Sequence, residues 1–290
     1  MLVDAIRAET WRLARNRATV FWTVGFLPIV GLAMGILGNL FLKANADKIT
    51  VNGKAPPELN QMLMGGPIRV VEEVIANVGA MANPIVLLFM LIGAATLYSG
   101  DYRWETWRLI SARNSRTNLL LGKVATMGLL ALLAMVVLLS GEIAQTVSKA
   151  VILERPMSWA VDGNAAGRFA GLFGLSWLAI MQFTMVGLLV AVLTRSLLAA
   201  LFAPIVIAAA QVFSPQALAP MGIGPDDWIA VLLNPGTAFG YLKATLIGGQ
   251  AALGLPDQAL LKGVVSIALN LFLPLLAALA WFKRQDLSKE

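Results

Sequence analysis

Six long apolar segments constrain this chain more than any other feature of its sequence. A helix needs about twenty mostly apolar residues to cross roughly 30 Å of bilayer hydrocarbon. Charged residues make up only 13% of the 290 residues, about half of their usual share in a soluble domain. We therefore predict an all-α integral membrane protein, with one transmembrane domain over residues 1–290. The expected spans are 19–42, 79–98, 120–146, 168–194, 196–214 and 263–282.

The N-terminal residues 2–17 have the pattern of a helix that lies in the membrane interface. At 100° per residue, Leu2, Ile6 and Leu13 share one face, and charged residues such as Arg12 occupy the opposite one. Apolar and charged faces of this kind are typical of interfacial helices. We expect this helix to precede the first span.

Lysine and arginine are unevenly distributed between the two sides that six spans define. The segments on the side of the two termini hold thirteen of these residues, and the longer segments on the other side hold nine. Because cytoplasmic loops carry the excess of positive charge, we expect both termini in the cytoplasm. The net charge of +6 then fits anionic lipid headgroups better than nucleic acid.

The long outer loop, residues 215–262, is punctuated by prolines and contains PGTAFGYLKATLIGG at 235–249. This stretch is too short to span a bilayer. It predicts an interfacial or re-entrant helix, which is tolerated at membrane depth only if protein buries it.

Several kinds of chemistry are excluded by composition. The chain has no cysteine and no histidine, which removes thiolate metal sites, Ser-His hydrolysis and HExxH metalloprotease chemistry. It also lacks the G-x-x-x-x-G-K-[ST] loop that holds ATP phosphates. We expect no metal and no catalytic site in this chain.

The segment that follows the second span, YSGDYRWETWRLISARNSRTNLLLGK, concentrates charge and tryptophan. On helical spacing, Trp104 and Trp107 form one stripe, and Asp101, Glu105 and Arg108 form another. The first stripe can rest on the membrane interface, and the second offers charges to the cytoplasm. The pattern alone also fits an ordinary basic loop that obeys the positive-inside rule.

The same segment resembles the signature of ABC-2 type permeases, the membrane subunits of one large class of ABC exporters. The matching positions are Asp101, Thr106, Arg113, Arg116 and Lys123. The chain departs from the family pattern twice in this segment. Glu stands where the family often has Gly, and Asn114 stands where it often has Pro.

Three further stretches extend the resemblance over nearly the whole chain. IRAETWRLARNRATVFW resembles the family's amphipathic elbow helix, with Glu9 and Arg12 in the usual places. LLNPGTAF resembles the Leu-Asn-Pro element of the last outer loop, and WFKRQDL resembles the basic, Asp-containing tail.

The resemblance implies a type V exporter-like permease subunit in a bacterial-type inner (cytoplasmic) membrane. It implies a cytoplasmic coupling helix at about 100–114 that rests in a groove of a separate ATPase. It also implies two ATPase copies that bind Mg-ATP and a second permease copy that completes a homodimer. The implied docking residues are Asp101, Trp104, Glu105, Arg108, Arg113 and Arg116. The implied substrate is an amphipathic peptide, drug or lipid-like molecule moved by alternating access.

Polar residues inside the spans are candidates for a substrate pathway. These are Glu142, Gln182, Gln211 and Asn270. Alternatives stay open for three of them: Glu142 can be hydrated near the outer surface, and Gln182 and Asn270 can bond neighbouring helices.

Two other functions are compatible with six spans. A secondary transporter driven by an ion gradient would favour several ionisable groups at the midplane and repeated halves. An intramembrane enzyme would need a nucleophile–base or carboxylate pair, and no expected span contains two acids. The secondary transporter is the main alternative to the ABC permease.

Overall fold

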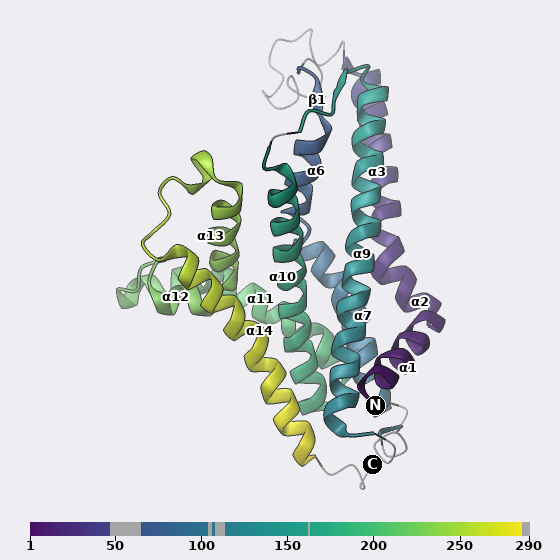
Figure 1. The fold of residues 1–290 in the computed structure, drawn as a ribbon, viewed down its shortest axis with the longest axis vertical. Helices are drawn as coiled ribbons and strands as arrows, with labels where there is room; N and C mark the ends of the chain where they lie inside the picture. Colours follow the sequence, from purple (N-terminus) through teal and green to yellow (C-terminus); the bar gives the residue numbers. More distant parts are fainter. Residues whose placement is uncertain (47–64, 104–105, 108–113, 162, 286–290) are drawn as a thin grey trace.

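Helices form nearly all of the structure, a computed structural model that describes residues 1–46, 65–103, 106–107, 114–161 and 163–285. Within these described ranges, six helices are long and apolar enough to cross a membrane, which confirms the prediction of a helical membrane protein. They are Arg17–Ala44, Pro84–Arg103, Arg116–Ile152, Ala165–Thr194, Leu197–Met221 and Ala259–Arg284. The start of the chain and the end of its sixth span lie at one end of the molecule (Figure 1), which we call the terminal end. The opposite end is the far end.

The first span begins directly after α1 (Leu2–Arg15), the expected interfacial helix. It consists of α2 (Arg17–Val20), a π-helical turn (Phe21–Gly25) and α3 (Phe26–Ala44). Asn16 separates α1 from α2 because its side-chain oxygen accepts a hydrogen bond from the Thr19 amide at 3.2 Å. Such a cap begins a new helix and lets the chain change direction.

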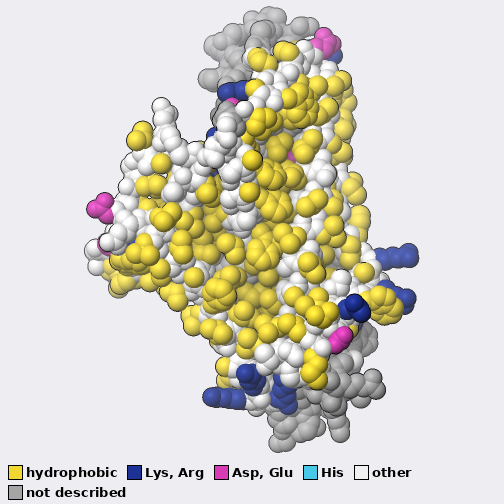
Figure 2. Space-filling model, in the orientation of Figure 1, with side chains coloured by type: hydrophobic (Ala, Val, Ile, Leu, Met, Phe, Trp, Pro, Cys, Tyr) yellow, Lys and Arg dark blue, Asp and Glu magenta, His cyan; other side chains and the backbone are white. Residues whose placement is uncertain are grey.

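The central helices are α7 (Pro84–Arg103) and α10 (Ala165–Thr194). Of the most apolar 18-residue stretch in each helix, 61% is buried inside the protein in α7 and 56% in α10. The corresponding share in the fifth span is 11%. The fifth span is α11 (Leu197–Leu218) with the 3-10 turn Ala219–Met221. Hydrophobic side chains cover the middle of the face in Figure 2. A helix that is apolar on its outer side suits a lipid environment.

The third span, α9 (Arg116–Ile152), has 37 residues, ten more than the expected segment 120–146. At 1.5 Å per residue it is about 55 Å long, so it extends well beyond the hydrocarbon layer. Figure 1 shows it running from the terminal end to the far end. There β2 (Met157–Ser158) pairs in parallel with β1 (Ile68–Arg69), just before α6 (Val70–Val78). This two-residue pairing is the exception to the helical fold among the described residues.

The outer loop before the last span folds into α12 (Trp228–Leu233), α13 (Pro235–Ile247) and a 3-10 turn (Gly249–Ala252). The predicted helix at 235–249 is therefore present as α13. It packs against α14 (Ala259–Arg284) and also contacts α10. Its 13 residues are too few to cross a bilayer.

Close contact between α1 and α9 depends on Gly122. A Cβ at this position would lie 2.9 Å from the Cβ of Ala5 and 3.2 Å from the Ala5 carbonyl carbon. Since real Cβ atoms essentially never lie closer than 3.0 Å to another non-bonded heavy atom, α1 would have to move. Glycine therefore lets α1 lie directly on the third span.

We expect Gly122→Leu to destabilise the protein by about 2 kcal/mol, because the added side chain overpacks the contact between α1 and α9. Thermal unfolding of the purified protein in detergent, followed by tryptophan fluorescence, measures this. Gly31→Leu is the matched control, since no atom lies within 4 Å of its Cβ position. Equal melting temperatures for the two variants would contradict this account of Gly122.

Candidate functional site

Four charged side chains from three helices meet at the terminal end. This buried charge cluster consists of Glu9, Arg12, Asp101 and Lys123. Arg12 Nη1 lies 2.6 Å from Asp101 Oδ1, and Arg12 Nη2 lies 2.8 Å from Glu9 Oε2. Lys123 Nζ lies 2.6 Å from Asp101 Oδ2 and 3.4 Å from Glu9 Oε1. Two acids and two bases leave the cluster with no net charge.

Three of the four side chains, those of Glu9, Asp101 and Lys123, are shielded from solvent, whereas Arg12 reaches the surface. The side chains of Lys123 and Asp101 are 0% and 1% exposed, and that of Arg12 is 45% exposed. Removing charges from water costs several kcal/mol per ion unless pairing and hydrogen bonds compensate. The compensation here is extensive, because each carboxylate contacts both cations.

Two further hydrogen bonds complete the cluster. Lys123 Nζ donates to the Leu97 carbonyl at 2.7 Å, so its three N–H groups have three acceptors. Thr106 Oγ1 donates to Asp101 Oδ1 at 2.6 Å. Burial by itself lowers the pKa of the Arg12 guanidinium, but its bond to Asp101 and the neighbouring carboxylate charges outweigh this effect and raise the pKa. Arg12 is therefore a permanent cation.

Trp107 lies beside the cluster and is fully buried. Lys123 Nζ is 5.3 Å from the centre of its ring, within the range of a cation–π interaction. The same ring lies 4.6 Å from Phe282 and 5.5 Å from Tyr102, centre to centre. The expectation that Trp107 rests on the membrane interface is therefore wrong, because its ring packs against α7, α9 and α14.

The predicted docking residues fall into two groups. Trp104, Glu105, Arg108 and Arg113 lie outside the described residues. Asp101 and Arg116 are described, and neither presents a free charge. The expectation that Asp101 offers its carboxylate to the cytoplasm is wrong, because Arg12 and Lys123 neutralise it within the fold.

Arg116 caps the C-terminal end of α14. Its Nη1 donates to the carbonyls of Phe282 and Lys283 at 3.2 Å each, and to that of Gln285 at 2.6 Å. The last carbonyls of a helix lack intrahelical partners and carry partial negative charge. An arginine at the start of α9 therefore holds the end of the last span.

Gln285 was not singled out in the sequence, yet it joins three helices. It accepts a hydrogen bond from the Tyr102 hydroxyl at 2.9 Å, and its amide donates to the Val192 carbonyl at 3.2 Å. The Arg116 bond to its backbone is the third contact. The end of α14 is thus attached to α7, α9 and α10.

The role of Lys123 as a buried counter-ion was also missed. In the sequence it is the last residue of LLLGK, which the family resemblance explains without any partner. A signal was present, however. A lysine within an apolar segment must pair with an acid or reach water, and the acids nearest to this membrane depth are Glu9 and Asp101.

Two of the four pathway candidates bond neighbouring helices or loops. Glu142 is half-buried, and its Oε2 accepts a hydrogen bond from the Asn77 amide at 3.2 Å. Asn270 donates to the Leu232 carbonyl at 3.0 Å, which attaches α14 to α12. This contact matches the alternative in which Asn270 joins elements rather than lines a pathway.

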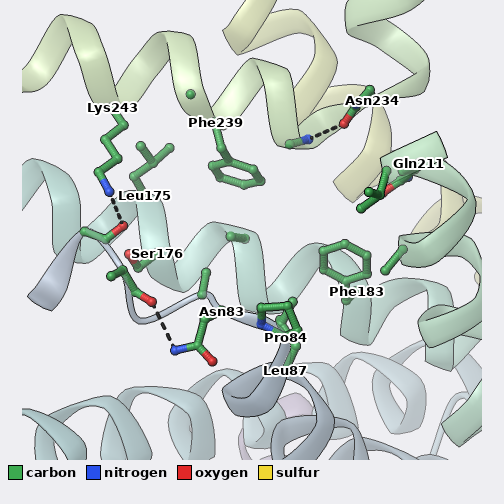
Figure 3. Close-up of a pocket in the computed structure, with 18 of the residues that line it drawn as sticks. Asn83, Pro84, Leu87, Leu175, Ser176, Phe183, Gln211, Asn234, Phe239 and Lys243 are labelled. Carbon is green, nitrogen blue, oxygen red and sulfur yellow. Dashed lines mark hydrogen bonds between the residues drawn. The ribbon is translucent and has the colours of Figure 1, made fainter. Parts of the chain in front are cut away.

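The other two candidates, Gln182 and Gln211, have different surroundings. Gln182 is buried in α10, and its Oε1 has no hydrogen-bond partner among the described residues. Gln211 lines a cavity of about 550 Å³ between α7, α10, α11 and α13. Ligand cavities typically measure about 300–1,000 Å³. In Figure 3, the rings of Phe183 and Phe239 lie between Gln211 on one side and Lys243 on the other.

Comparisons with known proteins do not identify a relative. No model of a known protein family matches the chain, and neither a curated protein nor a solved structure does. The function therefore has to be inferred from the geometry and from the sequence.

We expect Lys123→Met to destabilise the protein by about 3 kcal/mol, because it leaves an uncompensated negative charge in a buried site. Adding Glu9→Gln restores a neutral cluster, so the double variant should recover part of this loss. Thermal unfolding of the single and double variants in detergent gives the coupling between the two positions.

The matched control for this experiment is Lys43→Met, which removes the exposed pair with Glu154 at 2.7 Å. Exposed pairs contribute little, so its effect should stay within about 0.5 kcal/mol. Additive losses from Lys123→Met and Glu9→Gln would show that the two side chains do not interact.

Proposed function

We propose that the chain is the membrane-spanning permease subunit of an ATP-driven exporter of the ABC-2 type. A separate ATPase would bind the segment around 100–114 and drive alternating access. The observation that carries the proposal is the buried charge cluster, which fixes the end of α7, where this segment begins, to α1 and α9. The resemblance of the same residues to the family signature supports it.

The contacts at the terminal end offer a mechanical route from a docked ATPase to the spans. A displacement of the segment after α7 would act on Asp101, and through its ion pairs on Arg12 of α1 and Lys123 of α9. Arg116 and Trp107 would carry the same displacement to the end of α14. Rigid-body movements of this kind are a common way to switch between conformations.

The proposed assembly is the one that the family resemblance implies, and ATP is assigned to a separate subunit because the sequence has no phosphate-binding loop. Two copies of the ATPase would bind Mg-ATP, and two copies of this chain would form the permease homodimer. Both termini would be cytoplasmic, in a bacterial-type inner membrane, as the charge distribution favours. The cargo would be an amphipathic molecule.

The alternative of an ion-gradient-driven transporter has less support. Such transporters bind their coupling ions near the bilayer midplane. The buried charged residues that the structure describes are Glu9, Asp101 and Lys123, and they gather at the terminal end. Their position fits a structural connection better than an ion pathway.

Exchange of charges in the docking segment tests the proposed function. We expect Glu105→Arg with Arg108→Glu to decrease the amount of ATPase that copurifies with the chain by about tenfold or more. The reason is that like charges across an interface cost several kcal/mol. The chain is purified from its native membranes, and ATP hydrolysis and Walker-motif peptides are measured in the eluate.

The matched control is the exchange Arg69→Glu with Glu72→Arg, because this pair also lies three residues apart, at 3.0 Å, at the far end. It should leave the copurified ATPase unchanged. If no ATPase accompanies the unmodified chain, or if both exchanges have the same effect, the proposed function is wrong.

The orientation can be tested with single cysteines, because the natural chain contains none. We expect a membrane-impermeant maleimide to label Gly163→Cys, at the far end, on intact cells. Lys283→Cys, in the last turn of α14, should be labelled only after permeabilisation. The reverse pattern would place the proposed docking segment outside the cell, where no ATP-driven subunit could use it.

A further inference from the structure

The cavity between α7, α10, α11 and α13 has one charged side chain among its described lining residues, that of Lys243. Most of the other lining residues are apolar, including Leu87, Leu175, Phe183 and Phe239. Lys243 is half-buried, so its ammonium group can meet a molecule that enters the cavity. An anionic group on such a molecule would give it a partner of opposite charge.

The contacts of Lys243 leave room for such a partner. Its Nζ donates to the Gly79 carbonyl at 3.0 Å, which uses one of three N–H groups. Among the residues that the structure describes, no carboxylate lies within ion-pairing distance of this ammonium group. Lys149 and Lys43, also toward the far end, do have carboxylate partners.

Lys243 also lies where two cavities meet. It lines a second recess of about 400 Å³ together with Arg168 and Glu72, and Leu172 borders both spaces. The carboxylate of Glu72 is paired with Arg69 at 3.0 Å. The positive charge of Lys243 is therefore accessible from both cavities.

The apolar part of the larger cavity extends away from the ammonium group. In Figure 3, Lys243 stands on one side, the two phenylalanine rings lie in the middle, and Gln211 and Asn234 stand on the other side. A ligand that fills this space needs an anionic group near Lys243 and an apolar body along the rings. A fully polar anion would leave the apolar walls unused, and a neutral apolar molecule would leave the ammonium unpaired.

We propose that this cavity binds a single-chain amphiphile with one anionic group, of the fatty-acid type. Its head group accepts hydrogen bonds from Lys243, and its chain packs against Phe183 and Phe239. This inference rests on the proposed function in one respect, since it names the class of molecule that the permease would carry. The binding step itself requires no ATPase.

The test uses a photoactivatable dodecanoic acid with the purified chain in nonionic detergent, without nucleotide or partner. We expect cross-links on peptides of α10, α11 or α13. Unlabelled dodecanoic acid should compete at least about tenfold better than its methyl ester or dodecylamine, as a hydrogen bond to a charged group implies. Equal competition by the three compounds would overturn the proposal.

Two variants and one control locate the site. Lys243→Gln should weaken the binding of dodecanoic acid by about tenfold and leave the binding of its methyl ester unchanged. Gly240→Leu should block labelling, because Gly240 lines the cavity and no atom lies within 4 Å of its Cβ position. Lys262→Gln is the matched control, since this lysine also donates to a backbone carbonyl, that of Asp226 at 2.6 Å, but does not line the cavity.

The outcomes separate this inference from the proposed function. Unchanged labelling of Gly240→Leu, with a normal melting temperature, would overturn the cavity as the site. An equal loss in Lys243→Gln and Lys262→Gln would overturn the role of the ammonium. If an ATPase copurifies but the acid does not bind, the ligand class is wrong and the permease proposal stands. If the acid binds and no ATPase is found, the ligand class stands and the permease proposal is wrong.

Discussion

The arrangement of the terminal end depends on one requirement, that the Lys123 ammonium must not be left without counter-charges inside the protein. Its two carboxylate partners come from different helices, Glu9 of α1 and Asp101 of α7. Exposed ion pairs contribute little to stability, whereas breaking a buried ion pair is strongly destabilising. The buried pairs of Lys123 therefore hold the three helices in one relative position. The placement of α1 across α9, the close approach at Gly122 and the burial of Trp107 are all consistent with this constraint.

The six apolar helices and the separate helix at the N-terminus could be predicted from the sequence, because hydrophobic length and helical periodicity are local properties. The same is true of α13, where Asn-Pro begins the helix and Asn234 caps it by accepting from the Gly236 amide. The extra length of α9 could not be predicted in this way. Its first turn is polar and is capped by Ser115, which accepts a hydrogen bond from the Asn118 amide. Tertiary contacts of Arg116 at one end and Lys149 at the other also hold the ends of the helix.

The candidate site was only partly predictable, for a related reason. Asp101, Glu9 and Arg12 were each selected, but as members of separate elements, since the residues of the cluster are up to 114 positions apart in the chain. A pattern of charges on one helix cannot reveal which other helix covers it. Helical spacing alone therefore assigns Asp101 to an exposed stripe, whereas three-dimensional packing makes it the central acceptor of a buried network.

Proline distribution distinguishes the spans in a way that bears on movement. The fifth and sixth spans contain internal prolines, Pro204, Pro215 and Pro274, where helices bend, while α9 has none over its 37 residues. Because α9 is about 55 Å long, a tilt of the whole helix by roughly 5° at the charge cluster would displace its far end by about 5 Å. That end carries Lys149, which is paired with Glu73 of α6 at 3.2 Å. A small rotation at one membrane surface would thus reach the opposite surface along this single helix.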